Sequence, residues 1–233
     1  MTRGRKGSGP GRGGSARPPA RALKERVRTA RGRSVSSTAW LARQINDPYV
    51  KAAKADGYRS RAAYKLLQID EQAQVLRPGA LVVDLGAAPG GWTQVALARG
   101  ARVIAVDVSP MDPLPGAVVL ELDFLAADAP ERVRAAAGGP VSAVLSDMAA
   151  PATGHRQTDH LRIMALCEAA AAFADEVLEP GGTFVAKVLQ GGTEATLLAN
   201  LKRHFQAVRH YKPPASRKDS SEIYVIATGF RKL

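Results

Sequence analysis

LVVDLGAAPGGW, residues 81–92, decides the fold class of this chain. Its first five residues are apolar apart from one aspartate, so they predict a short buried strand. The glycines and proline that follow predict a turn, and residues 92–99 have the pattern of a helix. A strand, a glycine-rich turn and a helix in this order are typical of α/β sheets that bind a ligand where their strands end.

The rest of the chain alternates between strand and helix patterns. Further strands are predicted at 102–107, 117–120, 141–147 and 183–189, and helices at 60–69, 129–137, 159–178 and 194–204, the first with Ser60 as its N-cap. Strands joined by helical crossovers form a doubly wound, mostly parallel sheet. The last strands, 205–211 and 222–228, are joined by only about ten residues, so a closing antiparallel pair is expected. The expected fold class is α/β.

Positive charge is concentrated at the N-terminus. The chain has a net charge of +12, and residues 1–33 hold 11 basic residues and one acid, Glu25. We expect residues 1–33 to form a disordered basic arm that binds polyanions in a salt-sensitive way, and residues 34–233 to form one domain. An organellar transit peptide has a similar composition and stays an alternative, whereas a secretory signal would need an apolar segment that this arm lacks.

Composition excludes several classes of protein. Apolar residues make up 45% of the chain, which argues against wholesale disorder, and no stretch is long and apolar enough to predict a membrane partner. The single cysteine, Cys167, excludes a disulfide framework and a Cys-rich zinc site, and its Ala-rich surroundings predict a buried, inert thiol. The histidine spacing predicts no metal. A cytoplasmic monomer is expected.

The turn does not match the dinucleotide fingerprint G-x-G-x-x-G, because Ala87, Ala88 and Pro89 follow Gly86. It resembles the D-x-G-x-x-x-G loop with which S-adenosylmethionine (SAM) methyltransferases hold the amino acid end of their cofactor. Asp107, at the end of the second strand, is placed for ribose hydroxyls, and Asp123, after the third, for the adenine amino group. The predicted cofactor-binding residues are Asp84, Gly86, Pro89, Gly90, Gly91, Trp92, Asp107, Asp123 and Asp147. A nicotinamide dehydrogenase is disfavoured by the loop spacing.

Four charged residues outside the loop are candidates for catalysis. They are Lys65, Asp147, Lys187 and Glu222, here called the tetrad. Lys187 interrupts an apolar strand, where a lysine is costly unless it is paired. Each also has a structural alternative: Lys65 as a solvated helix residue, Asp147 as a turn former, Lys187 as a residue that extends its charge to water and Glu222 as an edge-strand charge.

Five segments together resemble the FtsJ/RlmE family. They are YRSRAAYKL (58–66), VVDLGAAPGGW (82–92), SDMAAP (146–151), FVAKVLQG (184–191) and SRKDSSEIYVIATGF (216–230). The resemblance leaves only the basic arm uncovered and carries the family's K-D-K-E tetrad onto the four residues above. It implies a Rossmann-like SAM-methyltransferase fold. It also implies methyl transfer to the ribose 2′-OH of a uridine in 23S-type large-subunit rRNA, within the assembled large ribosomal subunit.

The chemistry suggests a role for each member of the tetrad. A ribose hydroxyl is a weak nucleophile that must lose its proton during an in-line attack on the methyl group. We expect Lys187 to accept this proton, Asp147 to orient Lys187 and to approach the methionine end of the cofactor, and Lys65 and Glu222 to position the hydroxyl. Arg59, Arg61, Arg217 and Lys218 flank the tetrad and are expected either to bind RNA phosphates or to form a solvated basic surface.

Other functions remain open from sequence. Enzymes with the same tetrad methylate the cap-proximal ribose of messenger RNA or riboses of tRNA. A ribosome assembly factor that binds RNA without catalysis would also use a basic arm and this fold, although it would not need a lysine within a strand.

Overall fold

The computed structural model describes residue 25 and residues 35–151, 153–190 and 195–232. Apart from Glu25, the predicted basic arm therefore lies outside the described residues. The helices and strands follow in the order α1 (Val35–Ile45), α2 (Pro48–Asp56), α3 (Ala62–Ala73), β1 (Leu81–Leu85), α4 (Gly91–Ala98), β2 (Arg102–Asp107), β3 (Ala117–Glu121), α5 (Ala129–Ala137), β4 (Val141–Ser146), α6 (Arg156–Val177), β5 (Leu178–Leu189), α7 (Ala195–His204), β6 (Phe205–Tyr211) and β7 (Glu222–Phe230).

These strands form one seven-stranded sheet in the order β3-β2-β1-β4-β5-β7-β6. The pairs β1–β2, β1–β4, β2–β3 and β4–β5 are parallel. Strand β7 lies between β5 and β6 and is antiparallel to both of them. The predicted α/β class, the mostly parallel sheet and the antiparallel pairing of the last two strands are confirmed.

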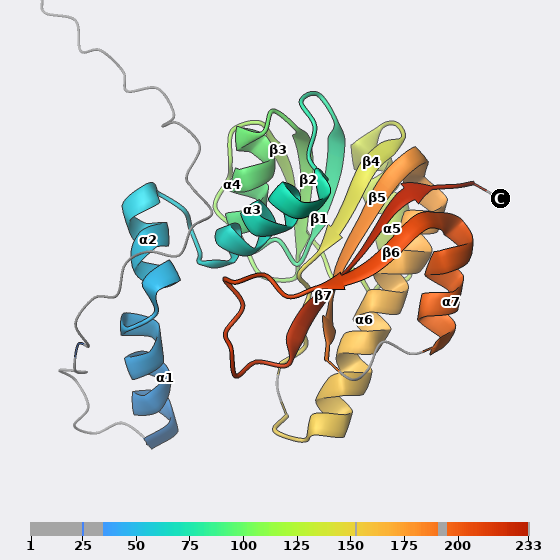
Figure 1. Cartoon of the computed structure of the whole chain (residues 1–233). Coiled ribbons are helices and arrows are strands. Elements are labelled where there is room, and N and C mark those ends of the chain that lie inside the picture. The colour runs from blue at the N-terminus through green and yellow to red at the C-terminus, as the bar shows by residue number, and fades with distance from the viewer. Residues whose placement is uncertain (1–24, 26–34, 152, 191–194, 233) are drawn as a thin grey trace, which may run out of the picture.

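Helices cover both faces of the sheet (Figure 1). On one face, α2, α3 and α4 pack against a buried cluster that includes Val82. On the other face, α5, α6 and α7 pack against a cluster that includes Leu81, Val83 and Leu85. Successive residues of β1 thus point to opposite layers, and all five are buried, as expected of a central parallel strand.

Two local predictions were wrong. Helix α3 begins at Ala62, with Arg61 at the N-cap position and no side-chain cap, whereas the Ser60 hydroxyl is buried and has no hydrogen-bond partner in the described part of the chain. The reason is tertiary packing, because the Ser60 hydroxyl lies where a Cβ of Gly91 would be. The strand predicted at 183–189 begins instead at Leu178, and the pairing of β5 with β4 shifts register between Leu178 and Thr183.

Three further observations concern membrane insertion, metal binding and the single cysteine. Among the residues that the structure describes, no helix has the length and apolar character needed to cross a bilayer. In the same residues, no group of three or more His, Cys, Asp or Glu side chains is arranged to hold a metal ion. Cys167 is buried on α6, and burial raises the pKa of its thiol to about 12, which keeps it neutral and unreactive.

Candidate active site

The loop between β1 and α4 (85–91) lies at the centre of the site. The Gly86 and Ala87 amides donate to the carbonyl of Val106 on β2, at 2.8 and 3.1 Å. Gly86 has a φ of +77°, and a Cβ there would come within 2.7 Å of the backbone of Met148. Glycine is therefore required at this position, since it lets the loops after β1 and β4 meet.

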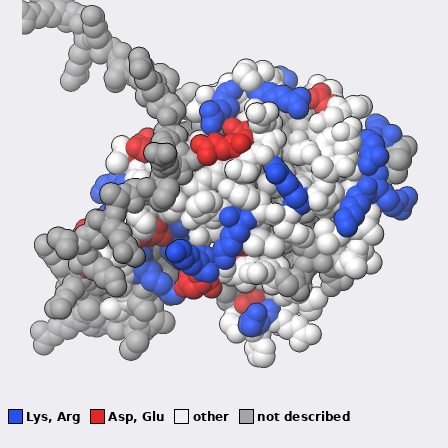
Figure 2. Space-filling model, viewed as in Figure 1, with Lys and Arg blue, Asp and Glu red and all other residues white. Residues whose placement is uncertain are grey.

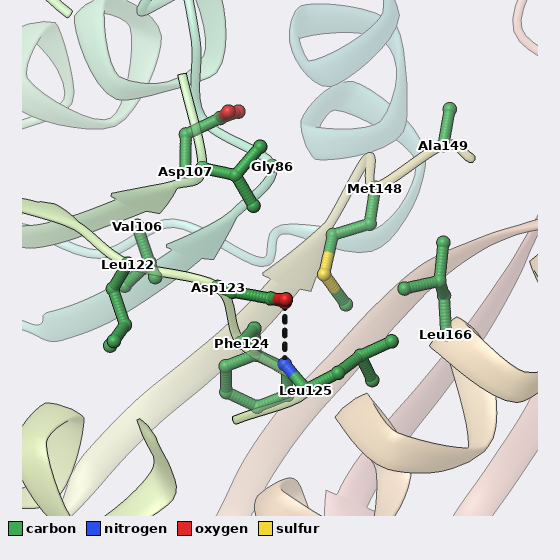
Figure 3. A pocket seen from close by; sticks show the side chains of 11 residues that line it. Gly86, Val106, Asp107, Leu122, Asp123, Phe124, Leu125, Met148, Ala149 and Leu166 are labelled. Carbon is green, nitrogen blue, oxygen red and sulfur yellow. Dashed lines mark hydrogen bonds between the residues drawn. The ribbon is translucent and has the colours of Figure 1, made fainter. Parts of the chain in front are cut away.

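A first pocket opens between this loop and the ends of β2 and β3 (Figure 3). Its lining residues are Gly86, Val106, Asp107, Val108, Leu122, Asp123, Phe124, Leu125, Met148, Ala149 and Leu166. Val108 and Leu125 are 63% and 57% exposed, although large apolar side chains are usually covered. The pocket thus offers apolar walls and carboxylates to the same ligand, which is the usual composition of a small-molecule site.

The two carboxylates of the first pocket have different surroundings. Asp107 accepts hydrogen bonds from the amides of Ala88 (2.9 Å) and Ser109 (2.8 Å), so it also fastens the loop after β1 to β2. Asp123 is exposed and extends toward the centre of the pocket, where one of its oxygens accepts from the Leu125 amide at 3.0 Å (Figure 3). Its second oxygen is left for a ligand.

Asp84 is a third carboxylate near the loop, and it is wholly buried. One oxygen accepts a 2.7 Å hydrogen bond from the Thr93 hydroxyl, whereas the other, Oδ1, has no partner among the described residues. Burial raises the pKa of Asp84 to about 7. The hydrogen bond from Thr93 lowers this pKa, whereas the negative charges of Asp147 and Asp107 raise it further. A cation bound nearby would relieve an unfavourable concentration of acids.

These features fit the expected cofactor. SAM carries positive charge on its sulfonium and ammonium groups, and four aspartates, Asp84, Asp107, Asp123 and Asp147, stand at the carboxyl ends of successive strands or just beyond them. The unpartnered oxygen of Asp84 provides an acceptor two residues before Gly86. The apolar walls beside Asp123 suit a flat base with an exocyclic amine.

The tetrad assembles around Asp147, just after β4. Lys187 Nζ donates to Asp147 Oδ1 at 2.9 Å and to the Asp147 backbone carbonyl at 2.7 Å. Lys65 Nζ lies 3.8 Å from Asp147 Oδ2 and forms a 2.8 Å ion pair with Glu222 Oε1. The structure thus brings together four residues that come from α3, the end of β4, β5 and β7.

Tyr224 is a fifth member of this cluster that sequence reasoning missed. It lies opposite Lys187 in the antiparallel pairing of β5 and β7. Its hydroxyl donates to Asp147 Oδ1 at 2.7 Å and accepts from Lys65 Nζ at 3.1 Å, while its ring packs on Trp92. The available signal was its position two residues after Glu222, because alternate residues of a strand share a face.

The charges of the cluster control its protonation. Burial raises the pKa of Asp147, but Lys187, Lys65 and the hydrogen bonds from Tyr224 and Lys187 lower it more, so the net shift is downward. The pKa of Tyr224 is raised well above its ordinary value, by burial first and then by Asp147 and Glu222. Asp147 is therefore an anion and Tyr224 a neutral donor at neutral pH.

A second pocket lies on the other side of the loop, next to the tetrad. Its lining residues are Arg43, Gln44, Ser60, Arg61, Ala62, Lys65, Ala88, Pro89, Arg217, Asp219, Ser220 and Glu222. Gly86 lines the first pocket, whereas Ala88 and Pro89 line the second, so the loop separates the two. This arrangement can present two ligands to one another across the loop.

The remaining predicted cofactor residues have roles in packing. The Trp92 ring is buried beneath α3, where its indole donates to the Ala62 carbonyl at 2.9 Å, and it does not line either pocket. Gly91 begins α4 and leaves room for Ser60, and Gly90 is enclosed by the side chains of Leu114, Arg59 and Met111. Cofactor contact at these three residues stays a prediction.

Of the four expected phosphate ligands, Arg59 is used inside the protein. Its guanidinium donates to the carbonyls of Pro89 (3.2 Å), Asp112 (2.6 Å) and Pro113 (3.0 Å). Arg59 therefore ties the loop after β1 to the segment after β2. Arg61 and Arg217 both line the second pocket, and Lys218 is exposed beside them.

Comparisons with known proteins point to one family. A family model described as FtsJ-like methyltransferase matches residues 58–230. Proteins named ribosomal RNA large subunit methyltransferase E from Parvibaculum lavamentivorans and Paramagnetospirillum magneticum are each 60% identical to the chain. The alignments cover 98% and 97% of this chain and 94% and 93% of those proteins. A crystal structure described as a ribosomal RNA methyltransferase from Plasmodium falciparum has a TM-score of 0.67 and 29% identity, over 74% of this chain and 98% of that one.

Proposed function

The chain belongs to the FtsJ-like methyltransferase family, and from this premise we propose that it methylates the ribose 2′-OH of a uridine in 23S-type large-subunit rRNA. It is a SAM-dependent enzyme. The substrate is the rRNA within the assembled large ribosomal subunit, and the enzyme acts as a monomer in the cytoplasm. The names of its relatives support rRNA as the substrate.

The observation that carries the proposal is the hydrogen bonding of Lys187. Its amine has two acceptors, the side chain and the backbone carbonyl of Asp147. A neutral amine has two hydrogens and one lone pair, so Asp147 occupies both hydrogens and leaves the lone pair for the proton of a 2′-OH. Lys187 is thus oriented as a general base.

Lys65 has a different set of partners. Glu222 Oε1 at 2.8 Å, the Tyr224 hydroxyl at 3.1 Å and Asp147 Oδ2 at 3.8 Å surround its amine. Three oxygens therefore face the Lys65 amine, two of them at hydrogen-bonding distance and the third as a longer ion pair. Lys65 then fixes Glu222 beside the second pocket.

The cofactor, when bound, supplies an electrophilic methyl group on a positively charged sulfur. The residues that would hold it are Gly86, Asp107 and Asp123, which line the first pocket, together with the buried Asp84. Asp147 connects the rest of the tetrad to the loop after β1. Its side chain accepts from Lys187, and its backbone amide donates to the Leu85 carbonyl at 3.0 Å. Asp147 thereby aligns the general base with the cofactor site, which is the positioning that an in-line transfer requires.

Methyl transfer from tritiated SAM tests the proposal. Purified large ribosomal subunits and protein-free rRNA serve as substrates for the wild type, for Lys187→Ala and for Lys202→Ala. Lys202 is an exposed lysine on α7 and provides the matched control. We expect label in 2′-O-methyluridine after digestion of the subunit RNA to nucleosides, unchanged in Lys202→Ala and lost in Lys187→Ala.

Each other outcome has a clear meaning. In parallel reactions with tRNA and with capped messenger RNA, label in either of these but not in rRNA would contradict rRNA as the substrate. SAM binding without methylation of any RNA contradicts the reaction and supports an assembly factor. Near-wild-type turnover by Lys187→Ala, with unchanged SAM affinity, contradicts the assignment of the base.

A further inference from the structure

A groove beyond the second pocket has no role in the site described so far. It runs between the start of α2 and the loop that joins β6 to β7, and its walls include Pro48, Tyr49, Lys212, Pro213, Pro214 and Lys218. We propose that this flanking groove binds the nucleotide next to the methylated one in a single-stranded segment of the substrate RNA. The inference rests on the proposed function and extends it to a second nucleotide.

The flanking groove is continuous with the second pocket. Arg61, Arg217 and Asp219 line both hollows, so these residues stand where one passes into the other. Consecutive nucleotides of an RNA strand are joined by one phosphate. A ribose beside Lys65 and a neighbouring nucleotide in the groove would therefore place that phosphate near the two arginines.

At the boundary between the two hollows, two arginines share one carboxylate. Asp47 Oδ2 lies 3.1 Å from Arg61 Nη1 and 3.4 Å from Arg217 Nε, so one carboxylate serves two guanidinium groups. The other oxygen of Asp47 accepts from the Tyr49 amide at 3.0 Å and caps α2. Asp219 also stands at this boundary, so the surplus of positive charge belongs to the flanking groove as a whole, whose described lining has four basic and two acidic side chains, and this surplus suits a phosphate.

Arg217 is the arginine available to a ligand. Within the described chain its bonded partner is Asp47, which it contacts through Nε, so the two terminal nitrogens of its guanidinium remain to donate. Arg61, by contrast, also donates to the Ala215 carbonyl through Nη2. Arg217 is half-buried, and this combination of a fixed base and free terminal nitrogens is suited to a bidentate phosphate contact.

The walls of the flanking groove suit a nucleobase. Pro48 and Pro214 are exposed, whereas Tyr49 and Pro213, which also line the groove, are mostly buried. Lys212 donates to the backbone carbonyls of Ser220 and Lys218, so it links the two ends of the β6–β7 loop that forms one wall of the groove. An unstacked base covers an apolar surface of this kind while its phosphates remain at the charged rim.

The surface charge favours RNA over a peptide as the occupant. Four basic and two acidic side chains line the flanking groove. Figure 2 shows Lys and Arg side chains gathered over the β6–β7 loop, with acidic side chains at their margin. An acidic peptide would satisfy the charge, but it would not explain the continuity of the groove with a pocket built for a ribose.

Binding of single-stranded RNA provides the first test. The anisotropy of a fluorescein-labelled uridine oligonucleotide is measured over a range of salt concentrations for the full-length wild type, Arg217→Gln and Arg102→Gln. We expect Arg217→Gln to weaken binding about fivefold and to reduce the slope of log K against log salt by about 0.7, the value for one lost phosphate contact on a single strand. Arg102 is exposed at the start of β2, and its variant should behave as the wild type.

Photo-cross-linking tests the position of the base. Thiouridine placed on either side of the target uridine is expected to cross-link to the peptide that contains Pro213, Pro214 and Lys218. Replacing the flanking base by an abasic site should weaken binding about fivefold in the wild type. Cross-links from the thiouridine to other peptides would overturn the inference. It would also be overturned if, with the assembled subunit, the groove cross-linked to a ribosomal protein and not to RNA.

Kinetics separate failure of this inference from failure of the proposed function. If the wild type methylates the large subunit, Arg217→Gln should raise KM for the subunit about fivefold and leave kcat and KM for SAM within about twofold. Unchanged KM for the subunit would overturn the flanking groove and leave the proposed function intact. A wild type that cross-links RNA at the groove without methylating it would support the groove and refute the proposed function.

Discussion

Two carboxylates in this protein, Asp147 and Asp47, are each shared by two cationic side chains, but the two clusters are suited to different functions. Asp147 lies between Lys65 and Lys187 in the tetrad, and Asp47 lies between Arg61 and Arg217 at the boundary of the second pocket. Both aspartates are mostly buried. The difference is therefore in the cations that surround them.

Lysine and arginine differ in whether they can release a proton. A lysine amine in a mostly buried site can become neutral and accept a proton, whereas a guanidinium stays charged under all ordinary conditions. The cluster around Asp147 is thus suited to moving a proton. The cluster around Asp47 is suited to holding a permanent positive charge, as phosphate recognition requires.

Asp84 shows what happens to a buried carboxylate that has no cation. Burial raises its pKa to about 7, whereas the two lysines lower the pKa of Asp147 below its ordinary value in spite of burial. Since both residues follow or end neighbouring strands of the same sheet, their position in the fold does not explain the contrast. The neighbouring cations do.

The largest expected effect on activity comes from replacing the lysine beside Asp147 by an arginine, the type of cation that stands beside Asp47. Lys187→Arg keeps the positive charge beside Asp147 but cannot accept a proton, so we expect methyl transfer to fall by about 10²–10⁴-fold, as for Lys187→Ala. Single-turnover methylation at saturating SAM measures this change. Activity of Lys187→Arg close to that of the wild type would show that the charge, and not the proton, matters.

The next effect concerns Asp84 and the pH dependence of folding. A folded-state pKa of about 7 lies above the ordinary value of 3.8, so the folded protein holds a proton that the unfolded chain has released between these pH values. The free energy of unfolding of the wild type should therefore decrease as the pH rises from about 4 to about 7. Asp84 should account for up to about 4 kcal/mol of this decrease, which Asp84→Asn should not show.

Urea denaturation of the wild type and of Asp84→Asn at pH 5 and pH 8 checks this prediction without cofactor. The difference between the two proteins should grow with pH in favour of the variant. A constant difference would mean that Asp84 is ionised in the folded protein at both pH values.

A smaller effect is expected when the charge of Asp47 is removed. Asp47→Asn retains an oxygen for the Tyr49 amide but leaves Arg61 and Arg217 facing one another, which should cost about 2–3 kcal/mol of unfolding free energy. Asp128→Asn is the matched control, because it removes an exposed ion pair to Arg132 that contributes about 0.5 kcal/mol or less. Equal losses in the two variants would refute a special role for Asp47.

The smallest effect should come from Arg217→Lys. This variant keeps a positive charge at the flanking groove but loses the bidentate geometry, so we expect KM for the large subunit to rise about two- to threefold. The contrast with Lys187→Arg is the point of the experiment, since the reciprocal substitution at the tetrad removes most of the activity. A loss of kcat in Arg217→Lys would place this residue in the chemical step instead.

Local patterns predicted a large part of this molecule. Strand and helix order followed from apolar runs and punctuation, and the antiparallel closing pair from the short connection between 205–211 and 222–228. Lys187 was identifiable because it is out of place in an apolar strand, and the resemblance to the FtsJ/RlmE family linked it to Lys65, Asp147 and Glu222. The N-cap at Ser60 was mistaken since the contact with Gly91 is 31 residues away along the chain and leaves no local signal.

The sequence by itself determined which elements form and which charged residues stand at strand ends, because hydrophobic period and residue type act locally. Only the tertiary structure decided how these residues share partners. The register of β5 and β7 puts Tyr224 beside Lys187, and the packing of α2 against the β6–β7 loop brings Asp47 to Arg217. Such contacts depend on long-range strand order and packing, to which no single stretch of sequence is sensitive.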